Sequence, residues 1–117
     1  MEQLNRVELR GIVGAARATI VGDRHMVRFS LATNLAYKDQ EGGVVIETQW
    51  SNIVCFESDR IHVDLESITK GDKLHVVGRL RNQRYMTESG EERYSTDIYA
   101  TRIEKIESEE PLQMELL

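Results

Sequence analysis

The chain has 117 residues, 40% of them hydrophobic and 30% charged, which suits one globular domain and excludes a disordered or low-complexity protein. Its formal net charge is −5, but residues 1–105 hold all 15 Lys and Arg against 16 Asp and Glu. The remaining four acids lie in residues 106–117, which hold no base. A near-neutral body can carry a basic stripe, so the acidic total does not exclude a polyanionic partner.

The N-terminal residues show no apolar stretch of a signal peptide, and no apolar run approaches the ~18 residues of a membrane span. We therefore expect a cytoplasmic protein without a membrane partner. The single cysteine, Cys55, lies among apolar neighbours and cannot form an internal disulfide. This context predicts a buried core thiol rather than a reactive one.

The first third of the chain reads as extended structure. Apolar and polar residues alternate over residues 4–13, which predicts a strand, and residues 15–21 continue it. Gly11 and Gly14 predict a bend or bulge, as small barrels need where a strand turns a corner. The dipeptide 22–23, Gly-Asp, predicts a tight hairpin turn.

Two further strands are predicted over residues 25–36 and 44–56, joined by a polar, glycine-rich loop. The third strand carries apolar side chains on both faces near its end. Ile53 and Cys55 share one face, which one core would bury, while Trp50 and Phe56 share the other. Since one buried face does not need the second pair, we expect these two aromatic side chains to serve another purpose.

Helical spacing follows. Ile61, Leu65 and Ile68 stand at i, i+4 and i+7, which predicts a short helix over residues 60–69, ended by Gly71 in a left-handed conformation.

Strands return over residues 73–86 and 93–106. Five strands with one helix between the third and fourth are typical of the OB-fold, so we predict an all-β, five-stranded Greek-key barrel. The barrel domain is expected to span residues 1–106, and residues 107–117 a short, acidic, flexible tail. A fold of this kind does not by itself define a function.

The sequence carries no phosphate-binding loop, nucleophile elbow or zinc-protease motif. His25, His62 and His75 are widely spaced and lack companion ligands, so we expect ordinary surface histidines and no metal or cofactor. No pair of acids stands in a context that marks a general acid or base. The chain is therefore not expected to be an enzyme, and no catalytic residue is assigned.

Aromatic residues near basic ones are the remaining signal. Rings on strand faces stack unpaired bases, and nearby Arg and Lys neutralise the phosphates between them. Tyr85 is expected to share a face with Arg79 and Arg81. Core packing or a subunit interface would also explain such aromatic side chains. Tyr94 and Tyr99 are interpreted as structural.

Five segments resemble the bacterial single-stranded DNA-binding protein family, in order and at the family spacing. They comprise residues 5–11 (N-R-V-E-L-R-G), 29–39 (F-S-L-A-T-N…Y-K-D), 48–56 (T-Q-W-S-N-I-V-C-F), 70–85 (K-G…V-V-G-R-L-R…Y) and 88–96 (E-S-G…R-Y-S-T). The long linker and acidic Pro-Phe tip typical of that family do not follow residue 106.

This resemblance implies an OB-fold that binds single-stranded DNA largely without sequence preference in replication, recombination or repair. Bases would stack on four aromatic residues, Tyr37, Trp50, Phe56 and Tyr85. Basic family positions fall on Lys38, Lys70, Arg81, Arg84 and Arg93, and the shared face adds Arg79 as a phosphate contact.

The resemblance also implies a homo-oligomer, a tetramer or alternatively a dimer, located with the nucleoid in the cytoplasm and in contact with replication or repair proteins. A second interpretation is a primosome-type adaptor. Primosomal replication protein N resembles the same family, lacks the acidic tip and acts as a dimeric bridge between replication proteins. Whether the aromatic residues are open or covered by another subunit would separate the two interpretations.

Overall fold

A computed structural model describes residues 1–116 and consists almost wholly of β-strands. The five long strands are β1 (Val7–Val21), β2 (Arg24–Lys38), β3 (Val44–Phe56), β4 (Lys73–Met86) and β5 (Glu92–Lys105). Their bounds lie within two residues of most of the expected ones, and the strands predicted over 4–13 and 15–21 form one continuous β1. The tight turn predicted at residues 22–23 joins β1 to β2.

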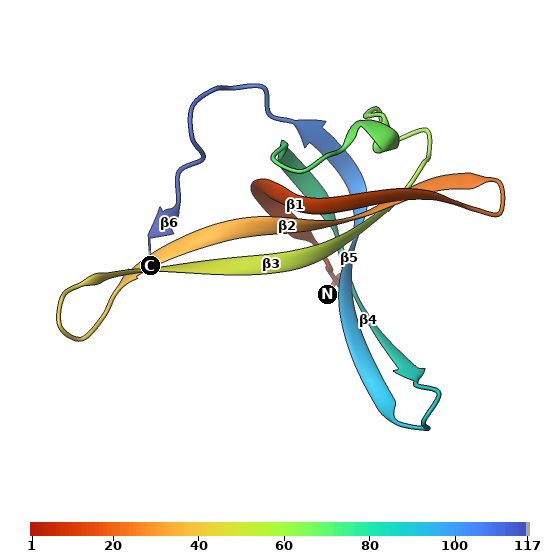
Figure 1. The fold of residues 1–117 in the computed structure, drawn as a ribbon, viewed down its shortest axis with the longest axis horizontal. Coiled ribbons are helices and arrows are strands. Elements are labelled where there is room, and N and C mark those ends of the chain that lie inside the picture. The colour runs from red at the N-terminus through yellow and green to blue at the C-terminus, as the bar shows by residue number, and fades with distance from the viewer. Residues whose placement is uncertain (117) are drawn as a thin grey trace.

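The strands close into a barrel. β1, β2 and β3 form an antiparallel meander, β1 also pairs with β4, and β4 pairs with β5. A short parallel contact between β3 and β5, at Ile53↔Ile98 and Val54↔Tyr99, completes the circuit. The five-stranded OB-fold is therefore confirmed, and Figure 1 shows the β2–β3 and β4–β5 hairpins extending from the barrel in different directions.

β1 serves two neighbours because it bends. Its first half pairs with β4 and its second half with β2, and the register shifts between Val13 and Ala15. At Gly11 a Cβ atom would lie only 2.3 Å from the carbonyl oxygen of Ala32, so only glycine lets the two backbones approach this closely. The bend and bulge predicted from Gly11 and Gly14 are confirmed.

Most of the core consists of strand side chains that point into the barrel, and Leu65 and Ile68 join them from the segment before β4. The core comprises Val13, Val27, Phe29, Leu31, Ile53, Cys55, Leu65, Ile68, Leu74, Val76, Ile98 and Ile103. Burial raises the pKa of the Cys55 thiol to about 11, so the thiol stays protonated at neutral pH. The prediction of a buried core thiol is confirmed.

The helix predicted over residues 60–69 is wrong in extent. The structure contains only one 3-10 turn there, η1 (Leu65–Ser67), capped by Asp64, whose carboxylate accepts a hydrogen bond from the Glu66 amide at 3.0 Å. Leu65 and Ile68 are buried against the barrel, so the spacing identified the side chains that face the core but not the backbone that carries them.

Gly71 has the expected positive φ of 92°, but it lies in a turn before β4 rather than at a helix end. Its N–H donates to the carbonyl of Val13 at 2.9 Å and so joins this turn to the bulge in β1.

The C-terminal segment returns across the barrel. The Lys73 ammonium donates to the carbonyls of Ser108 and Glu110, at 3.3 and 2.8 Å. A two-residue strand, β6 (Glu115–Leu116), then pairs in parallel with Leu35 and Ala36 of β2, as Figure 1 shows. The flexibility expected for residues 107–117 stays a prediction, and Leu117 lies outside the described residues.

Within residues 1–116, no helix has the length and apolar character needed to cross a membrane.

Candidate nucleic-acid interface

One outer side of the β-sheet carries most of the aromatic side chains of interest. Residues of β2 and β3 that face each other point to the same side, so Trp50 pairs with Ala32 and Phe56 with Met26 on the side opposite the core. Trp50 is 60% exposed, whereas Ile53 and Cys55 are buried. The predicted separation of the two faces of β3 is therefore confirmed.

Trp50 is held in place by the bulge in β1. Its ring crosses β2 and lies so close to Gly14 that a Cβ atom there would meet ring carbon Cζ3 at 2.4 Å. One side of the indole thus rests on backbone, while more than half of the residue remains open to solvent. A fixed, half-open ring of this kind is a suitable platform for a nucleobase.

Phe56 lies beside Tyr99, one of the two tyrosines that the sequence analysis interprets as structural. The Phe56 and Tyr99 ring centroids are 6.4 Å apart, with the planes tilted by 38°. The Arg24 guanidinium lies 4.9 Å from the Phe56 centroid, and the Arg81 guanidinium lies 5.0 Å from that of Tyr99. Cations over ring faces place positive charge directly beside the stacking surface.

The interpretation of Tyr99 as structural stays a prediction, but its ring lies on the outer side of the sheet, beside Phe56. The sequence indicates this orientation, because Tyr99 alternates with the core residue Ile98. Tyr94 is also not a core residue: it is 72% exposed and donates from its hydroxyl to Glu92 at 3.1 Å. We define the aromatic face as the outer surface formed by Trp50, Phe56, Tyr85 and Tyr99.

The β4–β5 hairpin contributes Tyr85, which is 51% exposed and pairs with Arg93. Arg79 and Arg81 lie at alternate positions on the same side of β4, as expected from the sequence.

Arg84 lies on the other side of the hairpin, opposite Tyr94, and its Nε is 3.0 Å from the Glu92 carboxylate. Arg93 shares the side of Tyr85 but pairs with Glu91 at 2.8 Å.

Tyr37 and Lys70 lie apart from the aromatic face. Tyr37 is half-buried near the tip of the β2–β3 hairpin, and its register with Val45 places it on the side opposite Trp50. Its neighbour Lys38 is exposed on the side of Trp50. Lys70 lies in the turn before β4, next to the bulge in β1. The structure thus places three of the four predicted stacking residues, Trp50, Phe56 and Tyr85, on one side of the sheet.

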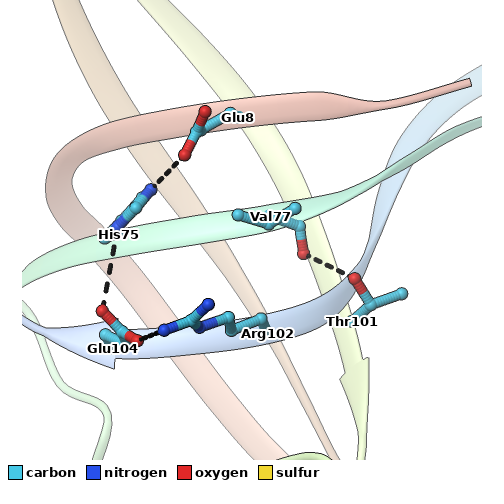
Figure 2. Close-up of polar contacts among 6 residues, drawn as sticks. All are labelled: Glu8, His75, Val77, Thr101, Arg102 and Glu104. Carbon is cyan, nitrogen blue, oxygen red and sulfur yellow. Dashed lines mark hydrogen bonds and ion pairs between the residues drawn. The ribbon is translucent and has the colours of Figure 1, made fainter.

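The basic side chains of β4 and β5 differ in whether a carboxylate already engages them. Across β1, β4 and β5, His75 Nε2 lies 2.7 Å from the Glu8 carboxylate and Nδ1 lies 3.9 Å from that of Glu104, which also pairs with Arg102 (Figure 2). The hydrogen bond from His75 lowers the pKa of Glu8 below its ordinary value. His75 and Arg102 are engaged by the two carboxylates of this cluster, so the cluster offers no free positive charge to an anionic ligand.

By contrast, Arg28, Arg79 and Arg81 form no salt bridge with any carboxylate among residues 1–116. Their charges are free for an anionic ligand. Within the same residues, no three His, Cys, Asp or Glu side chains gather to hold a metal ion. Unpaired arginines together with the exposed rings of Trp50 and Tyr85 form a combination that suits single-stranded nucleic acids.

The sequence model of the single-strand binding protein family matches residues 4–106. The chain belongs to this family. The resemblance found in the sequence is thereby confirmed.

Two relatives are single-stranded DNA-binding proteins of Rickettsia felis and Xanthomonas campestris pv. campestris, each 34% identical. The matches cover 81% and 88% of this chain, and 64% and 60% of the relatives, so the chain spans less than two thirds of their length.

Solved structures agree with the fold. A Plasmodium falciparum SSB in complex with ssDNA superposes with a TM-score of 0.79 at 26% identity, covering 92% of this chain and 98% of that one. A deletion mutant of the single-stranded DNA binding protein from Thermus aquaticus gives 0.74 at 19% identity, over 91% of this chain and 52% of its own, which supports the fold alone.

Proposed function

We propose that this protein binds single-stranded DNA largely without sequence preference. The observation that carries the proposal is Trp50, an indole seated on the backbone of Gly14 and 60% exposed on a face with unpaired arginines. Relatives that match this barrel are single-stranded DNA-binding proteins, which supports the same ligand for this chain. Bases would stack on Trp50, Phe56 and Tyr85, and on Tyr37 where the strand passes around the β2–β3 hairpin to its other side.

Stacking and charge supply different parts of the affinity. Each stacked base is worth roughly 1–3 kcal/mol and requires no particular base identity. Arg79 and Arg81 are the first candidates for phosphate contacts because no carboxylate competes for them. Arg84 and Arg93 must first exchange their glutamate partners, and Lys38 and Lys70 would extend the strand's path to either end.

A non-catalytic coating protein fits these features. It would protect exposed strands in replication, recombination or repair, in the cytoplasm where the nucleoid lies. We propose that it acts as a homo-oligomer, a tetramer or a dimer, because several barrels together would bind a longer strand than one. Contacts with replication or repair proteins belong to the same proposal.

Quenching of tryptophan fluorescence tests the proposal, because Trp50 is the single tryptophan of the chain. Titration with oligo-dT should quench the emission saturably, and the binding should weaken as salt rises because counterions are released. Duplex DNA of equal length is the control. If oligo-dT leaves the fluorescence of the folded protein unchanged, the aromatic face binds something else, and an adaptor role becomes the better account.

A further inference from the structure

Two arginines face each other on the first two strands of the barrel. Arg17 of β1 pairs directly with Arg28 of β2, so both side chains point to the same side of the sheet. Both are exposed, and neither forms a salt bridge with a carboxylate among residues 1–116. Like charges that lie directly opposite each other destabilise a sheet. The pair therefore suits an anion that binds to both guanidinium groups at once.

Arg28 lies between the two aromatic residues of β3 that belong to the aromatic face. On β2, Ala32 pairs with Trp50, and Met26 pairs with Phe56. Arg28 stands between these two partners and points to the same side of the sheet, because side chains two residues apart on a strand share a side. A strand whose bases stack on Trp50 and Phe56 would carry its linking backbone past Arg28.

The indole of Trp50 comes close to the arginine pair because it reaches across β2. A Cβ atom added at Gly14 would overlap both ring carbon Cζ3 of Trp50 and the hydroxyl oxygen of Ser30. Ser30 and Arg28 are two residues apart on β2, which corresponds to about 7 Å at ~3.4 Å per residue. The arginine pair thus occupies the row of side chains next to the indole, on the side towards Phe56.

A groove of about 430 Å³ includes both arginines in its lining, together with Asn52 and Asp97. Asp97 is 7% exposed and forms no salt bridge with Arg17 or Arg28. Two guanidinium groups beside one carboxylate leave a single positive charge in excess. One phosphate would neutralise that charge.

We propose that Arg17 and Arg28 form a clamp for one phosphate, which lies in the backbone between a base stacked on Trp50 and a base stacked on Phe56. A planar guanidinium can donate two parallel N–H groups to phosphate oxygens, so two of them can hold one phosphate from both sides. Every nucleotide supplies this group, so the clamp fixes the course of the strand without reading its sequence. The clamp rests on the proposed function and adds to it two residues that were not among the expected phosphate contacts.

The salt dependence of binding counts the phosphates that the two arginines hold. Anisotropy of labelled oligo-dT at several salt concentrations gives the slope of log K against log salt, which is about 0.7 per phosphate contact on a single strand. Arg17→Gln and Arg28→Gln should each lower the affinity but keep the wild-type slope, because the remaining arginine still neutralises the shared phosphate. The double variant should bind about 10- to 150-fold more weakly, with a slope shallower by about 0.7.

Slopes that become shallower by about 0.7 in each single variant and by about 1.4 in the double variant would overturn the clamp, because the arginines would then hold separate phosphates. Wild-type affinity and slope in the double variant would overturn it as well. Arg102→Gln is the matched single-charge control. The Glu104 carboxylate already engages the Arg102 guanidinium (Figure 2), so this variant should keep both the affinity and the slope.

Circular dichroism establishes that the variants fold. If the double variant does not, the slopes of the two single variants still decide, because a shared phosphate leaves them unchanged and separate phosphates do not. Failure of the wild-type protein to bind oligo-dT would be a different result, because it would refute the proposed function itself.

Discussion

At the scale of single residues, the candidate site depends on close contacts between strands that are distant in sequence. Gly14 in β1 sets the position of Trp50 in β3, although 36 positions separate them in the chain. Phe56 in β3 meets Tyr99 in β5 in the same way. The orientation of Trp50 therefore depends on Gly14, and that of Phe56 depends on Tyr99.

Gly14→Ala should weaken single-stranded DNA binding by displacing the indole. The new Cβ would overlap Cζ3 and Cη2 of Trp50, so the ring must leave its seat. A double-mutant cycle with Trp50→Ala, measured by anisotropy with oligo-dT, checks the mechanism. Trp50→Ala alone should cost roughly 1–3 kcal/mol of binding free energy, and adding Gly14→Ala should then change little. Additive losses would show that Gly14 acts independently of Trp50.

Tyr99→Ser should also weaken binding, by roughly 1–3 kcal/mol if its ring stacks a base. Tyr94→Ser on the same strand is the matched control, because Tyr94 lies on the opposite side of the β4–β5 hairpin and is 72% exposed. The affinity for oligo-dT should fall in the first variant and hold in the second. Equal losses in both would place the strand on both sides of the hairpin.

At the scale of elements, the strands and the turn between β1 and β2 were predictable, but the connection between β3 and β4 was not. Alternating side chains mark β3 and β4 to the residue, because a half-buried strand must alternate. The helix predicted over residues 60–69 was wrong in extent, because apolar side chains at helical spacing can also pack into a barrel core from an irregular segment. The β3–β5 closure, the seat of Trp50 and the groove at Asp97 come from long-range register, which no local pattern contains.

The β4–β5 hairpin should carry much of the salt dependence of binding. Replacing both Arg79 and Arg81 with Gln removes two unpaired charges, so the slope of log K against log salt should become shallower by about 1.4, at roughly 0.7 per phosphate contact on a single strand. Arg102→Gln is the control, since the Arg102 guanidinium is already engaged by the Glu104 carboxylate. Oligo-dT titrations at several salt concentrations give the slopes. An unchanged slope in the double variant would remove the hairpin from the phosphate path.

The Glu8–His75 contact between β1 and β4 should make a small contribution to the free energy of unfolding that is lost at acidic pH. The pKa of Glu8 is lowered in the folded state, chiefly by the hydrogen bond with His75, so the folded state binds the Glu8 proton less readily than the unfolded chain. This contribution is present above the unfolded pKa of about 4.3 and is lost as the pH falls through the lower folded pKa.

Glu8→Gln should therefore lower the melting temperature at pH 6 and make little difference at pH 3, as thermal unfolding of both proteins would measure. A gap of the same size at both pH values would mean that the Glu8 charge is not involved.

At the scale of the whole molecule, the barrel closes through only two parallel residue pairs between β3 and β5, which we call the seam. The aromatic face spans this seam, with Trp50 and Phe56 on β3 and Tyr99 on β5. A bound strand would therefore hold together two elements that share little backbone pairing. Cys55 lies fully buried beside the seam, so its thiol can react only when the barrel opens.

The labelling rate of Cys55 should report this coupling. In the folded protein the thiol is buried and its pKa is about 11, so a disulfide reagent should react far more slowly than with the denatured chain. A ligand that binds the closed barrel alone stabilises it by about 2.7 kcal/mol at a hundred times its Kd, which slows labelling about 100-fold. Saturating oligo-dT should produce this slowing, and duplex DNA should not. Labelling that ignores oligo-dT would mean that the strand does not bridge β3 and β5, and that opening at this seam is independent of the ligand.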